Sequence, residues 1–104
     1  MVKINGETWR IFQVSPNHPM LMRDDGGFAL GSCDDPAKGI YISEMVKGEK
    51  FKKVLCHELT HAAMYSYNVN LTIEQEEILA DLIATYGQEI IHETNRIFTR
   101  IKRG

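Results

Sequence analysis

Two histidines and a glutamate near the middle of the chain are the residues best suited to chemistry. His57, Glu58 and His61 form the pattern His-Glu-x-x-His. On a helix, this four-residue spacing places both imidazoles on one face, one turn apart, where they can bind one cation. Zinc accepts such nitrogen ligands and keeps a position for water when its site is catalytic. Glu58 is then predicted to act as general base, and later as general acid, on a metal-activated water.

A catalytic zinc site usually has a third protein ligand, and the residues after position 72 offer several carboxylates. Glu77 and Asp81 are four residues apart and would share one helix face. Glu77 is the predicted third ligand, and Asp81 is expected to accept the free ring N–H of a ligand histidine. Glu76 and Asp81 stay open as alternative ligands. Otherwise Glu74 and Glu76 are expected on a solvated face.

If the activated water attacks a peptide carbonyl, the site also requires a donor that stabilises the developing oxyanion. The side chains available for this role are Tyr65, Tyr67, His18 and His92. The sequence does not select one of them.

Two helices are predicted to position these residues. Apolar residues recur with helical spacing between residues 50 and 67. A second, longer helix is expected after Thr72, which forms a capping-box pattern with Gln75, and Gly87 would weaken its middle. The basic residues between 96 and 103 suit its C-terminal end. Its buried stripe is expected to consist of Ile73, Leu79, Leu82, Ile83, Tyr86, Ile90 and Ile91.

The first half of the chain is predicted to form short strands. Strand-like segments occur at residues 7–14, 28–31 and 40–43, and turn residues separate them. An antiparallel arrangement is expected because the connections are too short for crossover helices. The predicted fold class is therefore α+β, with a small antiparallel sheet of about three strands packed on two or three helices. The 104 residues fit a single domain, with a strand-rich half at 1–49 and a helical half at 50–104.

Composition and charge restrict the class of protein. A content of 43% hydrophobic and 25% charged residues is typical of a soluble globular domain. The net charge of −2 gives no reason to expect binding to nucleic acid or to a membrane. The chain contains no apolar run of about 18 residues, and its first residues do not form a secretory signal. We therefore expect a cytoplasmic protein whose two cysteines are reduced thiols.

The residues around the histidine pair resemble a known group. His57-Glu58-x-x-His61 followed by Glu77-x-x-x-Asp81 resembles the gluzincin pattern, and residues 54–62 and 77–87 are similar to compact ImmA/IrrE-like metallopeptidases of phages and mobile elements. The similarity covers mainly residues 40–91. It implies a minimal zincin-like domain in which His57, His61 and Glu77 hold Zn²⁺.

The same resemblance implies how a substrate would bind. In that family the histidine helix packs on a small sheet whose edge strand borders the cleft. Ile40, Tyr41 and Ile42 would form this edge strand. An extended protein or peptide substrate would add to it through backbone hydrogen bonds.

The predicted function is zinc-dependent peptide-bond hydrolysis by a metalloendopeptidase. The alternative is a non-catalytic interaction protein on a peptidase scaffold, with zinc acting as a clasp between two helices. Glu58 favours the enzyme, because a structural site requires ligands but no base. The basic residues Arg96, Arg100, Lys102 and Arg103 are too few and too mixed to favour nucleic-acid binding. The substrate, its cleavage preference and the oligomeric state are left open.

Overall fold

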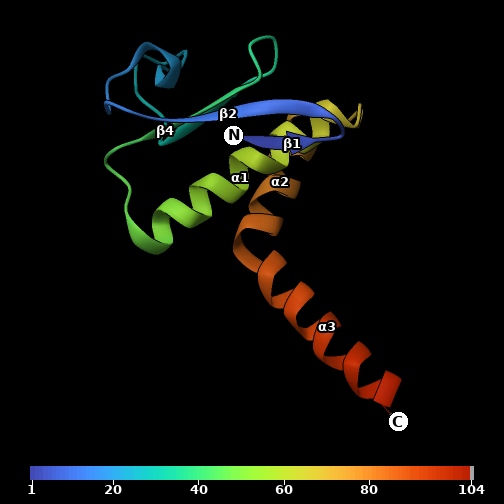
Figure 1. Ribbon diagram of the computed structural model, residues 1–104. Helices are drawn as coiled ribbons and strands as arrows, with labels where there is room; N and C mark the ends of the chain where they lie inside the picture. Colours follow the sequence, from blue (N-terminus) through green and yellow to red (C-terminus); the bar gives the residue numbers. More distant parts are fainter. Residues whose placement is uncertain (104) are drawn as a thin grey trace.

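The computed structural model describes residues 1–103 and shows a β-sheet layered on helices (Figure 1). The predicted α+β class is confirmed. The strands are β1 (Val2–Ile4), β2 (Glu7–Val14), β3 (Gly31–Asp34) and β4 (Gly39–Ser43). The helical segments are the 3-10 helix η1 (Pro19–Leu21), α1 (Gly48–Ser66), α2 (Ile73–Leu82), the π-helix η2 (Ile83–Gly87) and α3 (Gln88–Arg103).

The sheet is mixed, with the strand order β1-β2-β4-β3. β1 and β2 are antiparallel, β2 and β4 are parallel, and β4 and β3 are antiparallel. The expected purely antiparallel arrangement is therefore corrected. A connection between parallel strands usually contains an α-helix. Here residues 15–38 connect β2 to β4, and they contain only the short helix η1 and the strand β3, so nothing in the sequence indicated a parallel pair.

Two strand positions differ from the expectation. β1 was not predicted, although the turn that joins it to β2 carries a strong hairpin signal. Asn5 and Gly6 both have positive φ, at 49° and 80°, which a two-residue hairpin turn requires. The strand expected at residues 28–31 begins later, as β3, while Phe28 forms an isolated bridge to Met22.

The core lies between the sheet and α1. Its buried side chains are Trp9, Ile40, Ile42, Val46 and Ala62. Trp9 also fixes the end of α1, because its indole Nε1 donates a hydrogen bond to Ser66 Oγ at 2.8 Å. This hydrogen bond therefore holds the C-terminal end of α1, the helix that carries the histidine pair, against β2.

The second helical region begins as expected and then departs from the prediction. Thr72 and Gln75 form both hydrogen bonds of a capping box at the start of α2. Gly87 ends the π-helical segment η2, where the sequence allowed a kink. The expected buried stripe is wrong for most of its residues, however: Leu79 and Ile83 are half-buried, but Ile73, Leu82, Tyr86, Ile90 and Ile91 are exposed. Ile90 and Ile91 are exposed because α3 extends away from the sheet and α1 (Figure 1).

Candidate functional site

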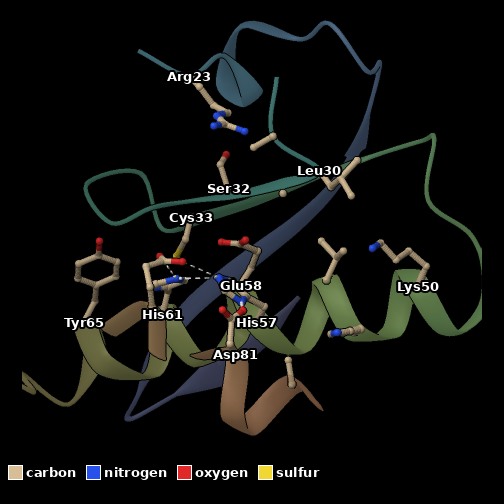
Figure 2. A pocket seen from close by; sticks show the side chains of 16 residues that line it. Arg23, Leu30, Ser32, Cys33, Lys50, His57, Glu58, His61, Tyr65 and Asp81 are labelled. Atoms are coloured by element: carbon tan, nitrogen blue, oxygen red, sulfur yellow. Dashed lines mark hydrogen bonds and ion pairs between the residues drawn. The ribbon is translucent and has the colours of Figure 1, made fainter. Parts of the chain in front are cut away.

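Three side chains converge between α1 and α2, as the sequence predicts. The Nε2 atoms of His57 and His61 lie 3.2 Å apart on successive turns of α1. Glu77 on α2 places Oε1 at 2.9 Å from the Nε2 of His61 and Oε2 at 3.3 Å from the Nε2 of His57. Figure 2 shows the histidine pair on α1, with α2 beside it.

The outer ring nitrogens of both histidines are held by carboxylates. His57 Nδ1 lies 3.0 Å from Oδ1 of Asp81, and His61 Nδ1 lies 2.8 Å from Oε1 of Glu76. A carboxylate can only accept a hydrogen bond, so each Nδ1 is the donor. In the neutral rings this tautomer leaves the Nε2 lone pairs facing one another and the Glu77 carboxylate.

This arrangement suits a cation. Two imidazole lone pairs and a carboxylate repel one another at these distances unless a positive charge lies among them. Ligands about 2.0–2.1 Å from one zinc ion at tetrahedral angles are roughly 3.3 Å apart, close to the spacings of the three atoms here. His57, His61 and Glu77 could therefore hold a metal ion.

The alternative ligands Glu76 and Asp81 have a different position. Each bonds an outer nitrogen, whereas Glu77 is the carboxylate that faces both Nε2 atoms. The solvated position expected for Glu76 is wrong, since its side chain is only 16% exposed. Its role was missed because Glu76 precedes Glu77 directly and thus lies on a different part of the helix surface. Only the angle between α1 and α2 brings both residues to the same pair of rings.

Glu58 lies beside the histidine pair and is buried, with 7% of its surface exposed. Burial raises the pKa of its carboxyl group from 4.5 to about 7; His57 lowers this pKa when its ring is protonated, and the Glu77 carboxylate raises it. A carboxyl group that titrates near neutral pH can both take and return a proton under physiological conditions. Figure 2 shows Glu58 on the side of α1 that faces β3.

A cavity of about 740 Å³ is lined by His57, Glu58, His61 and Glu77. Its walls come from α1, from β3 and the residues before it, and from α2. Along α1, the residues that line the cavity extend from Lys50 at one end to Tyr65 at the other (Figure 2). Arg23 points toward the cavity from the opposite wall. The cavity is thus long enough to extend past the histidines on both sides.

The strand beside the cavity is β3, which corrects the prediction for Ile40, Tyr41 and Ile42. These residues belong to β4, which pairs with β2 on one side and with β3 on the other. β4 is therefore an interior strand and has no free edge for a substrate. The strand-like residues at 40–43 predict a strand correctly, but they do not specify which strands pair with it.

Gly31, at the start of β3, is a site residue that sequence reasoning missed. A Cβ atom at this position would lie 2.8 Å from Val54 Cγ1 and 3.1 Å from Glu58 Oε2. The absence of a side chain therefore lets β3 approach Glu58 closely. The available signal was a glycine at the end of the strand segment predicted at residues 28–31, but it did not identify the facing residue.

Among the four candidate oxyanion donors, the structure brings only Tyr65 to the cavity. Its ring stacks on Trp9 with centroids 6.4 Å apart. Burial, and to a lesser extent Glu76, raises the pKa of its phenol, which therefore stays protonated at neutral pH. Tyr67 is 59% exposed, His18 stacks on Tyr41, and His92 lies on α3.

The burial of Glu58 predicts how the stability of the metal-free protein varies with pH. Because the pKa of about 7 in the folded state exceeds the ordinary 4.5, the folded state binds more protons between these values. The free energy of unfolding should then fall as pH rises from about 4.5 to above 7. Replacing Glu58 with glutamine should remove this slope and stabilise the protein at about pH 8 by on the order of 1–3 kcal/mol.

Urea unfolding of both metal-free proteins at about pH 5 and pH 8 measures this difference. If the two proteins lose the same stability between these pH values, Glu58 does not titrate as its burial predicts.

No protein-family model matches the chain, and neither the curated proteins nor the solved structures contain a significant match. Among residues 1–103, no helix combines the length and the apolar character that crossing a membrane requires.

Proposed function

We propose that this chain is a zinc-dependent endopeptidase in which His57, His61 and Glu77 hold the metal. The observation that carries the proposal is the convergence of the two Nε2 atoms on the Glu77 carboxylate, with both outer nitrogens bonded by carboxylates. Hydrogen bonds of this kind orient ligand histidines and increase their basicity. The resemblance of residues 40–91 to ImmA/IrrE-like gluzincins supports the same function.

Besides the metal ligands, two residues of this chain would take part in the reaction, Glu58 and Tyr65. When bound, zinc would polarise the substrate carbonyl and lower the pKa of water to about 7. Glu58 accepts the proton from the attacking water and then delivers it to the leaving amine. Tyr65, whose phenol stays protonated, donates a hydrogen bond to the developing oxyanion.

The substrate is proposed to be an extended peptide that lies along β3. This strand ends the sheet and lines the cavity with Gly31, Ser32 and Cys33. A peptide paired with the backbone of β3 would pass over the histidine pair, with α1 on its other side. The two unpaired thiols, Cys33 and Cys56, fit the cytoplasmic location expected for the protein.

A library of short peptides incubated with the zinc-loaded protein tests the function. We expect cleavage products in mass spectra, their loss after chelation, and their return when zinc is added back. Cleavage that persists at the same rate after complete removal of metal would contradict the proposal.

Tyr65 has its own test and a matched control. Tyr65→Phe should lower kcat by about 10²–10³-fold and leave KM nearly unchanged, since the hydrogen bond forms mainly in the transition state. Tyr67→Phe, an exposed tyrosine near the end of the same helix, should have no effect. Equal kinetics for the two variants would exclude Tyr65 as the donor.

A second candidate function is a zinc clasp without catalysis. One observation favours it: Ala80 is the one residue of α2 that is fully buried, while Ile73, Ile78 and Leu82 are exposed. A metal shared by α1 and α2 would hold this helix in place where its apolar contacts are few. The clasp predicts zinc binding without any peptide cleavage.

A further inference from the structure

α3 carries an apolar face that the described chain leaves uncovered. The helix extends away from the rest of the molecule (Figure 1). Its large apolar side chains are between 48% and 73% exposed, namely Ile90, Ile91, Ile97, Phe98 and Ile101. An exposed apolar surface of this kind usually marks an interaction site.

The spacing of these residues matches a two-helix seam. Ile90, Thr94, Ile97 and Ile101 follow one another at intervals of four, three and four residues, which is the pattern of the core positions in a coiled coil. The Thr94 hydroxyl donates to the carbonyl of Ile90 at 2.8 Å, so its polar group is already bonded within the helix. The seam is therefore suited to pairing with another helix.

The charges beside the seam indicate the orientation of that second helix. One flank of α3 carries Glu89 and Glu93 in its first half and Arg96 and Arg100 in its second half. When two copies of α3 pair in antiparallel orientation, this flank of one helix lies against the same flank of the other helix. The two flanks then run in opposite directions. The acidic half of the flank in one copy then faces the basic half in the other copy. Because the pair is symmetric, this contact occurs twice.

We propose that two copies of this chain associate through antiparallel pairing of α3. Ile90 packs against Ile101 of the second copy, Ile97 against Thr94, and Glu93 faces Arg100. Ile90 also lines an apolar groove at the base of α3, together with Cys56, Ile83 and Gly87, so Ile101 of the second copy would lie at the edge of this groove. This inference does not depend on the metal site.

The molecular mass in solution tests the association. Sedimentation equilibrium of the full chain should give twice the monomer mass of 11.9 kDa at high concentration. Ile97→Lys should raise the dissociation constant at least about thirtyfold, because a charge enters the centre of the seam. Thr99→Lys, on the opposite face of the same helix, should leave it unchanged. A wild-type protein that stays monomeric, or binds anionic vesicles as a monomer, overturns the proposal.

A charge exchange tests the orientation. Glu93→Arg should weaken the dimer several-fold, because an arginine then faces Arg100 of the second copy. Combining it with Arg100→Glu should recover most of the lost affinity, since opposite charges meet again between the copies, while the bond between Glu93 and Arg96 within each helix stays lost. Failure of the double variant to recover, while Ile97→Lys still dissociates the dimer, would exclude the antiparallel arrangement.

Discussion

Glu58→Gln is expected to lower the rate of peptide cleavage by about 10²–10⁴-fold while the protein still binds one zinc ion. Glutamine keeps the shape of the side chain and fills the same buried position beside His57. It cannot accept a proton from water, however, so the loss should appear in kcat and not in metal affinity. Cleavage kinetics and zinc titration on the same preparations separate the two effects.

A matched control for this variant is available on the same helix. Glu49 lies in the first turn of α1 and is exposed. Glu49→Gln should leave both cleavage and zinc binding unchanged. If Glu58→Gln cleaves as fast as the wild type, Glu58 is not the general base; if neither protein cleaves any peptide while both bind zinc, the zinc clasp remains.

Removal of one metal ligand is expected to remove most of the stabilisation by zinc. Zinc at 100 times its dissociation constant should stabilise the folded protein by about 2.7 kcal/mol. For a domain of this size, this corresponds to a rise in melting temperature of roughly 10–20 °C. His61→Ala and Glu77→Gln should remove most of this rise, because each takes away one of the three converging ligands.

The control for this second prediction is Glu74→Gln. Glu74 lies in the first turn of α2, is exposed, and makes no ion pair with the histidines in the described structure. Its variant should show the full rise on addition of zinc. A Glu77→Gln protein that zinc stabilises as strongly as the wild type would show that Glu77 is not a ligand.

The sequence predicts the site better than the sheet, and the reason is physical. A four-residue interval on a helix determines which side chains share a face, so the spacing alone places His57 with His61 and Glu77 with Asp81. The role of Glu76 depends on how α1 and α2 cross, which no interval within one helix encodes.

The order of the strands was not predictable in the same way. Ile40 and Ile42 indicate a buried strand, but hydrophobic alternation gives no information on which strands pair with it. The edge position that the family resemblance implies for Ile40, Tyr41 and Ile42 is held by β3 instead. Helical spacing also predicted an apolar face on the second helical region. Spacing alone does not show whether another part of the same chain packs against that face.

X-ray absorption at the zinc K-edge tests the central claim most directly. With one equivalent of zinc, the spectrum should show two imidazole nitrogens and one carboxylate oxygen at about 2.0–2.2 Å, and His61→Ala should lose one of the imidazoles. Sulfur ligands at about 2.3 Å from Cys33 or Cys56, or a spectrum that His61→Ala leaves unchanged, would contradict the proposed site.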